Sequence, residues 1–257
     1  MDDKIIKLAM PGHDKVLVEL KQRYEKVRLK KCFVVCWYGP WPVYFQVYLN
    51  SCSYNKGWNW IIFTDTDITN YNVPDNVEVV YRTLVELKDL FEKKLSIRFG
   101  KLKPYKLCDF KPSYGLIFEE YLKSYDYWGF CDIDLIWGNL NSIFPDGIIS
   151  KYDKFLTKGH MTLFKNSEKN KYLFQKEICR YVDYRIILSS KYNWGFDETG
   201  RFSIDKIIDK EPFYRCYRDM ALIADISPYH DGMYIENNGE MKKIQYAVFN
   251  GGGICEA

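Results

Sequence analysis

Two aspartates, Asp132 and Asp134, stand in the most apolar and aromatic stretch of the chain, YDYWGFCDIDLIWGNL (residues 125–140). In a strand, residues two apart point to the same face, so both carboxylates would point the same way if the strand continued regularly. Paired carboxylates in an apolar setting repel each other and lose hydration, and a divalent cation removes both penalties. Mg²⁺ or Mn²⁺ prefers oxygen ligands and keeps positions open for phosphate oxygens. The spacing therefore predicts that Asp132 and Asp134 hold Mn²⁺ or Mg²⁺ at the end of a strand.

A second D-x-D, formed by Asp65 and Asp67 in FTDTD, shows that the spacing alone is weak evidence. A solvated loop is the simpler interpretation of that second pair. Asp132 and Asp134 differ because the apolar strand YWGFC precedes them and LIWGNL follows. In open α/β sheets the ligand crevice lies beyond the carboxyl ends of the strands. We therefore expect a binding site at the end of the strand that leads into Asp132.

The elements that must position these acids follow from alternating apolar runs and helical patterns. A helix is expected from about Ser113, ahead of the strand that leads into Asp132. Strands alternating with helices indicate an α/β fold, with a mainly parallel sheet covered by helices on both faces. The other expected strands are 32–37, 58–65, 77–83 and one across 154–167, and the other expected helices are 43–55, 84–99, 167–182 and 197–210.

Composition restricts the class of protein. The chain has 257 residues, 28% of them charged, and a formal net charge of +3, which argues against disorder and against a nucleic-acid partner. No apolar run reaches the ~18 to 20 residues that a membrane span needs. Eight scattered cysteines without a C-x-x-C pair favour reduced thiols in a cytoplasmic protein. We expect a single domain over 31–257 with an N-terminal helical extension, 1–30.

The N-terminal extension contains a basic, amphipathic pattern between Asp14 and Lys31, with Leu17, Leu20 and Val27 at helical spacing. One interpretation is a helix that packs on the domain. The other is peripheral contact with an anionic membrane surface or with a partner, which would bring the protein to the inner face of the membrane.

The ordered motifs WYGPWP, WNWIIFTD, KLCDFKP and GFCDIDLIWGNL resemble those of the GT-A class of nucleotide-sugar glycosyltransferases. They are most similar to those of a bacterial group associated with surface polysaccharide synthesis. The resemblance covers roughly residues 31–165 and rests on the order of the motifs. It implies a GT-A-like (Rossmann-like) domain over 31–257. It also implies transfer from a nucleotide-diphosphate sugar, with a UDP-sugar as first choice, to a glycan or lipid-linked glycan acceptor.

The resemblance also implies roles for residues near the donor. Asp132 and Asp134 would form the D-x-D motif that bridges Mn²⁺ or Mg²⁺ to the donor diphosphate. Tyr38 and Gly39, in the loop after the first strand, would border the nucleoside, and Asp65 would reach the base or ribose.

Three further residues, Lys106, Asp109 and Lys111, match the position at which such enzymes hold the ribose and donor sugar. Helix capping or a surface ion pair is the alternative interpretation for them. The segment GHMTLFKN, 159–166, resembles the strand that borders the acceptor site.

Glycosyl transfer develops negative charge on the departing diphosphate, and a clamped metal stabilises that charge. An inverting reaction also needs a base for the acceptor proton, and Asp197 or Glu198 in WGFDETG is the candidate. A helix N-cap followed by an acid in the first turn explains the same pair.

His230, in SPYHDGMY, is a candidate third metal ligand or a donor to phosphate, and a surface or packing role is its alternative. In related enzymes a C-terminal histidine or basic segment often closes the site, whereas the printed sequence ends in FNGGGICEA. Four tryptophans near predicted loop mouths are candidates for sugar contact, with core packing as the alternative: Trp37, Trp41, Trp137 and Trp194.

Two other functions fit parts of the pattern. A catalytically silent GT-A-like protein that binds a glycan or a biosynthetic partner agrees with the C-terminal sequence and the three histidines. A metal-dependent phosphohydrolase agrees with the paired acids, but it lacks the additional His and Asp clusters that a two-metal centre needs. The leading hypothesis is therefore a metal-dependent glycosyltransferase.

Overall fold

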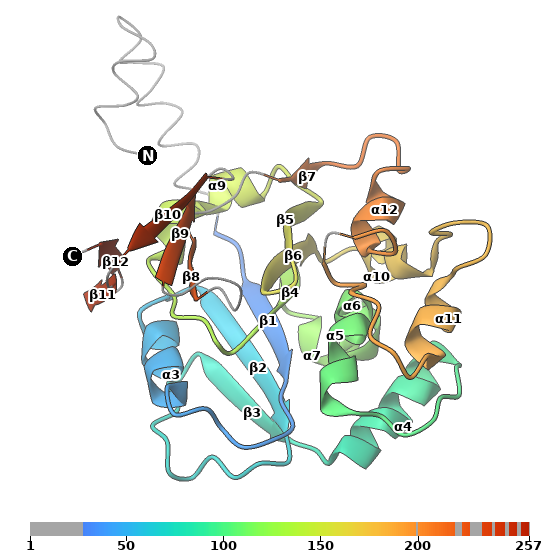
Figure 1. The fold of residues 1–257 in the computed structure, drawn as a ribbon, viewed down its shortest axis with the longest axis horizontal. Coiled ribbons are helices and arrows are strands. Elements are labelled where there is room, and N and C mark those ends of the chain that lie inside the picture. The colour runs from blue at the N-terminus through green and yellow to red at the C-terminus, as the bar shows by residue number, and fades with distance from the viewer. Residues whose placement is uncertain are drawn as a thin grey trace, which may run out of the picture.

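A seven-stranded mixed sheet forms the centre of the computed structural model, in the order β3-β2-β1-β4-β6-β5-β7 (Figure 1). The structure describes residues 28–198 and 200–218, and beyond them the backbone of five short strands. Neighbouring strands from β3 to β4 are parallel, as are β5 and β7, and β6 is antiparallel to both of its neighbours. The strands of this sheet are β1 (Lys31–Cys36), β2 (Trp58–Thr64), β3 (Val77–Tyr81), β4 (Tyr127–Cys131), β5 (Lys154–Lys158), β6 (Met161–Lys165) and β7 (Cys216–Tyr217).

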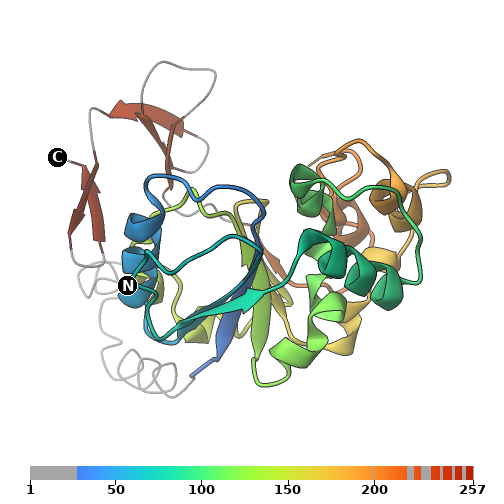
Figure 2. The same cartoon turned by 90° about the horizontal axis from the view of Figure 1, so that it is seen from below.

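Helices cover both faces of the sheet, which confirms the predicted α/β class. Figure 2 shows the sheet between α3 on one side and α4 to α7 on the other. The helices are α3 (Phe45–Ser53), α4 (Leu84–Leu95), α5 (Leu107–Phe110), α6 (Tyr114–Ile117), α7 (Glu119–Leu122), α8 (Leu140–Ile143), α9 (Asp146–Ile149), α10 (Glu168–Lys171), α11 (Tyr184–Ser189) and α12 (Ile204–Ile208), and the 3₁₀ turns are η1 (Pro104–Lys106), η2 (Lys111–Ser113) and η3 (Leu173–Gln175).

Strand alternation divides the apolar side chains between two cores. In β1, Cys32 and Val34 pack into the core beneath α4 to α7, whereas Phe33 and Val35 pack into the core beneath α3. All four side chains are at most 4% exposed. Because both faces are buried, β1 reads in the sequence as a continuous apolar run.

Three predicted elements were wrong. The helix expected over 197–210 is only α12, with Ser203 at its N-cap position, so Asp197 and Glu198 do not cap it. The single strand expected across 154–167 is a hairpin of β5 and β6, because the chain turns at Gly159 and His160. The long helix expected over 167–182 is only α10 followed by η3, because the backbone becomes extended at Lys176.

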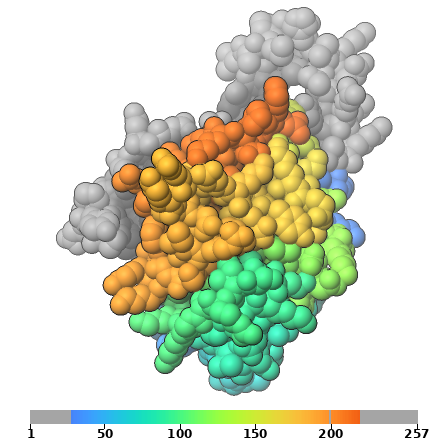
Figure 3. Space-filling view, turned by 90° about the vertical axis from the view of Figure 1, so that its right-hand side faces the viewer, coloured from blue at the N-terminus to red at the C-terminus, as the bar shows by residue number. Residues whose placement is uncertain are grey.

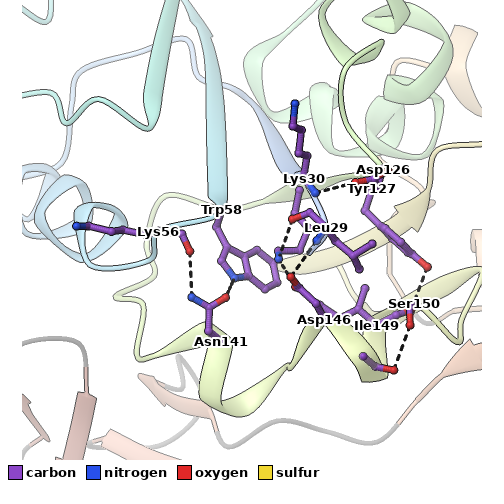
Figure 4. Close-up of polar contacts among 12 residues, drawn as sticks. Leu29, Lys30, Lys56, Trp58, Asp126, Tyr127, Asn141, Asp146, Ile149 and Ser150 are labelled. Atoms are coloured by element: carbon purple, nitrogen blue, oxygen red, sulfur yellow. Dashed lines mark hydrogen bonds and ion pairs between the residues drawn. The ribbon is translucent and has the colours of Figure 1, made fainter. Parts of the chain in front are cut away.

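The amino end of the sheet is fixed by polar contacts (Figure 4). Asp146 of α9 accepts a hydrogen bond from the Leu29 backbone nitrogen at 2.9 Å and pairs with the ammonium of Lys31, which is 1% exposed. On the neighbouring strand, Trp58 Nε1 donates to Asn141 Oδ1 at 2.9 Å. These contacts set the start of β1 and β2, so that their carboxyl ends lie at a defined level.

The N-terminal extension was predicted to be helical from Asp14 to Lys31. Residues 28–30 are irregular and Lys31 already belongs to β1, and the rest of that prediction falls outside the described residues. At the other end, β8 (Ile223–Ile226), β9 (Met233–Asn237) and β10 (Glu240–Ile244) form an antiparallel sheet, and β11 (Ala247–Asn250) pairs with β12 (Gly253–Glu256). Among the described helices, none is long and apolar enough to cross a membrane.

Candidate functional site

The order of the strands defines a switch point between β1 and β4. From β1 the chain builds β2 and β3 on one side and then crosses to β4 on the other. The register pairs Val34 with Phe130, so Cys36 and Asp132 lie at one level at the carboxyl ends of these two strands. Ligands of open α/β sheets bind outside the carboxyl ends of the strands at such a point.

Asp132 and Asp134 both lie beyond the last residue of β4. The Asp132 backbone nitrogen still donates to the His160 carbonyl at 3.1 Å, and the chain then bends. Ile133 is 2% exposed, whereas the Asp132 side chain is 38% exposed and Asp134 is exposed. A buried isoleucine thus lies between two acids that reach solvent.

Lys111 joins Asp132 to two other segments of the chain. Its ammonium donates to Asp132 Oδ1 at 2.7 Å and to the Gly159 carbonyl at 2.9 Å, and it lies 2.9 Å from Asp197 Oδ2. Lys111 is 7% exposed, so these three acceptors match the three donors of a buried ammonium. Burial lowers the pKa of Lys111, but the adjacent carboxylates of Asp132 and Asp197 outweigh it and raise the pKa above its ordinary value.

Asp197 and Glu198 occupy different environments, although they are neighbours. Asp197 is 2% exposed, and its burial, only partly offset by Lys111, raises its pKa to about 6. Glu198 is exposed, and its side chain packs over Gly159 in the turn between β5 and β6. A Cβ at Gly159 would lie 2.8 Å from both Asp197 Oδ2 and Glu198 Cγ, so this turn needs a glycine. Of the two predicted base candidates, Glu198 is the one that solvent reaches.

Lys106 and Asp109 form a buried clamp, which we call the Lys106–Asp109 clamp. Asp109 is 0% exposed, accepts from Lys106 Nζ at 2.7 Å, and accepts from the backbone nitrogens of Trp194 and Phe196 at 3.0 Å each. Lys106 Nζ also donates to the Ile187 carbonyl at 2.7 Å and the Tyr192 carbonyl at 2.6 Å.

The contacts of the clamp correct the role that the resemblance implied for Lys106 and Asp109. Both polar groups are buried and bonded to the segment that leads into Asp197, so they position that segment and do not present themselves to a sugar. The surface ion pair considered as the alternative is also wrong, because this pair is buried. Figure 3 shows the face on which the green region of α4 and α5 adjoins the yellow to orange region of α10 to α12.

The residues predicted to border the nucleoside follow β1 and β2. Tyr38 is 8% exposed, and its hydroxyl has no hydrogen-bond partner among the described residues. Burial raises the pKa of this phenol above its usual range. The Gly39 carbonyl accepts from Thr66 Oγ1 at 2.9 Å, and Asp65 is exposed directly after β2.

Arg82 was not predicted as a residue of the site. It directly follows β3, and its Nε is buried without a hydrogen-bond partner in the described part of the chain. Tyr38, Asp65 and Arg82 therefore follow three neighbouring parallel strands at the same edge of the sheet. Its position after the third strand was the signal that could have identified Arg82.

The four tryptophans considered for sugar contact have unequal access to solvent. Trp137 is 4% exposed and stacks on Phe33, so it is a core residue and that prediction was wrong. Trp37 and Trp41 are partly exposed and stack on each other with centroids 6.3 Å apart. Trp194 is partly exposed, but its Nε1 is buried.

Within the described residues, no group of three or more His, Cys, Asp or Glu side chains could hold a metal ion by itself. His230, the candidate third ligand, lies outside those residues. The seven cysteines described are free, and burial raises the pKa of several of them, including Cys36 and Cys131.

Comparison with known proteins gives a family and no function. The chain belongs to a family of unknown function (DUF6625), whose model matches residues 33–257. Neither the curated proteins nor the solved structures contain a match to this chain.

Proposed function

We propose that this member of the DUF6625 family is a metal-dependent glycosyltransferase that moves a sugar from a nucleotide-diphosphate donor to a glycan or lipid-linked glycan acceptor. One observation carries the proposal: Asp132 and Asp134 follow β4 directly, beside the switch point, where Asp132 is partly exposed and Asp134 is exposed. The residues after β1, β2 and β3 offer polar groups along the same edge, where the nucleoside of the donor would lie.

The acids fit a cation that is shared with a diphosphate. Lys111 binds Oδ1 of Asp132. Asp132 and Asp134 are the carboxylates that would hold Mn²⁺ or Mg²⁺ at this rim, ions that one or two carboxylates plus substrate phosphates commonly hold. When bound, the cation would stabilise the negative charge of the departing diphosphate.

The remaining residues of the site have distinct roles in the proposal. Lys111 orients Asp132 and limits the repulsion among the acids. Asp197 anchors Lys111 from the buried side. Glu198 is exposed beside them and would accept the proton of the acceptor hydroxyl.

The ion pair between Lys111 and Asp132 is the observation that favours a second candidate. An ammonium 2.7 Å from Asp132 already neutralises part of the acidic charge. A GT-A-like protein that binds a glycan or a partner without catalysis would need no further cation at this site. The two candidates differ in whether nucleotide sugars bind and react.

The test is a panel of UDP- and GDP-sugars with and without Mn²⁺, read by thermal unfolding and by nucleotide release. A donor at about 100 times its Kd should add about 2.7 kcal/mol to the free energy of unfolding. Asp134→Asn should remove the part of this gain that depends on Mn²⁺. Asp67→Asn is the matched control, because it changes the second acid of the other D-x-D, after β2, and should retain the gain. If no donor stabilises the wild type or is hydrolysed, the proposal is wrong and the silent binder replaces it.

A further inference from the structure

Two tyrosine rings stand out into solvent next to the Lys106–Asp109 clamp. Tyr105 is 77% exposed and Tyr192 is 66% exposed. Tyrosine is usually only partly accessible in a folded domain. Rings this exposed near a candidate site call for a ligand or a partner.

Hydrogen bonds from neighbouring side chains fix the backbone of both tyrosines. Lys106, the residue after Tyr105, donates from its ammonium to the Tyr192 carbonyl at 2.6 Å. Asn193, the residue after Tyr192, donates from Nδ2 to the Tyr105 carbonyl at 3.2 Å. Asn193 is itself held, because its Oδ1 accepts from the Gly195 backbone nitrogen at 2.8 Å. Two reciprocal contacts thus hold the backbones of Tyr105 and Tyr192 next to each other.

The Tyr105 ring also lies within electrostatic reach of the acids. The pKa of the Tyr105 phenol is raised, first by Cys108, then by partial burial, and then by the carboxylates of Glu198, Asp197 and Asp132. The same chain segment that carries Tyr192 continues through Trp194 and Phe196 to Asp197. Tyr105 thus lies near the acids, and Tyr192 lies on the segment that leads into Asp197 and Glu198.

We propose that Tyr105 and Tyr192 form a platform on which a pyranose of the acceptor stacks, so that one of its hydroxyls faces Glu198. This inference rests on the proposed function, because it identifies the acceptor as a carbohydrate with an exposed C–H face. Rigid aromatic rings bind such a face at low entropic cost, and neighbouring carboxylates accept hydrogen bonds from its hydroxyls.

Charge makes other ligands less suitable. A polyanion would meet the carboxylates of Asp132 and Glu198, which reach solvent, whereas Lys111 is buried behind Asp132. One face of Tyr192 is already approached by the Lys191 ammonium, 5.0 Å from the ring centroid. The free ring surfaces suit a neutral, hydroxyl-rich ligand.

The experiment measures binding of free saccharides without donor or metal. A panel of neutral disaccharides (cellobiose, lactose, maltose and chitobiose) is titrated against the full chain and followed by saturation-transfer NMR. We expect at least one to bind, each single Tyr→Ala change to weaken it about fivefold, and the Tyr105→Ala/Tyr192→Ala double variant to weaken it about 25-fold. Tyr181→Ala is the matched control, since Tyr181 is 75% exposed and should leave binding unchanged.

Each outcome decides the inference. Binding that the double variant loses and Tyr181→Ala retains supports the platform. No binding by the wild type, or an equal loss in Tyr181→Ala, overturns it. Because these rings are exposed, we expect all variants to unfold at the same urea concentration as the wild type. Equal midpoints exclude unfolding as the cause of lost binding.

The donor assay separates this inference from the proposed function. If donor hydrolysis by water persists in the double variant while transfer to the disaccharide is lost, both stand. If no donor binds the wild type but the disaccharide does, the platform stands and the glycosyltransferase proposal fails. If donors react but the rings bind no saccharide, the platform alone is wrong.

Discussion

Replacing Asp109 tests whether the Lys106–Asp109 clamp holds the segment that leads into Asp197. Asp109→Ala leaves the Lys106 ammonium, 7% exposed, without its carboxylate, and it leaves the backbone nitrogens of Trp194 and Phe196 without an acceptor. Removing one partner of a buried ion pair costs about 3 to 5 kcal/mol. We therefore expect urea unfolding to show a loss of that size.

Two further variants sharpen this prediction. Lys106→Met/Asp109→Leu removes both charges and replaces them with apolar groups of similar size. It should recover only the part of the loss that comes from an unpaired charge, because the backbone nitrogens of Trp194 and Phe196 still lack an acceptor. Asp89→Ala, an exposed aspartate of α4, is the matched control and should change the free energy of unfolding by less than about 0.5 kcal/mol.

Hydrogen exchange then locates the effect. In Asp109→Ala, the amides of Trp194 and Phe196 should exchange faster, while the amides of the β1–β2 ladder keep the protection that global stability allows. The reasoning is refuted if Asp109→Ala unfolds within about 1 kcal/mol of the wild type, or if the two amides stay protected at the wild-type level.

Three other predictions follow from single positions. Gly129→Ala would place a Cβ 2.1 Å from the Thr162 carbonyl oxygen, so β4 and β6 must separate, and calorimetry should show a loss of at least about 2 to 3 kcal/mol. Asp197 has a pKa of about 6 in the folded chain against about 3.9 unfolded, so its stabilising contribution is complete below about pH 4 and is lost as the pH rises through 6. Asp197→Asn should remove that loss, worth up to about 3 kcal/mol, and identical pH profiles for the two proteins would contradict it. Lys111→Met removes the cation that keeps the pKa of Asp197 down, so the same step should move to higher pH, and a step that stays in place would show that Lys111 has little influence there.

The strands at the centre of the sheet could be predicted because their apolar runs are short, β-branched or aromatic, and bounded by loop residues. The sequence of β1 carries all of these signals locally, and so does that of α4, whose Thr83 and Glu86 form a capping box. The hairpin of β5 and β6 was missed because its turn at Gly159 is too short to interrupt the apolar pattern. Local patterns define an element well and its ends poorly.

The candidate site was only partly predictable, because its contacts join distant parts of the chain. The D-x-D after β4 could be identified from its flanks, and Asp197 and Glu198 from their types. The partners of Asp109 lie 85 and 87 residues further on, so no local pattern shows that its carboxylate is used to hold a loop. Lys111 was expected to face a ligand, whereas its ammonium is divided among Asp132, Asp197 and a carbonyl.

The most direct test of the central claim is the affinity of UDP for this protein, measured by calorimetry with and without Mn²⁺, for the wild type and for Asp134→Asn. The claim predicts that Mn²⁺ tightens UDP binding to the wild type by about tenfold or more, a gain of about 1.4 kcal/mol, and that Asp134→Asn loses this gain. Equal UDP affinity with and without Mn²⁺ in the wild type would contradict a cation held between the acids after β4 and a diphosphate.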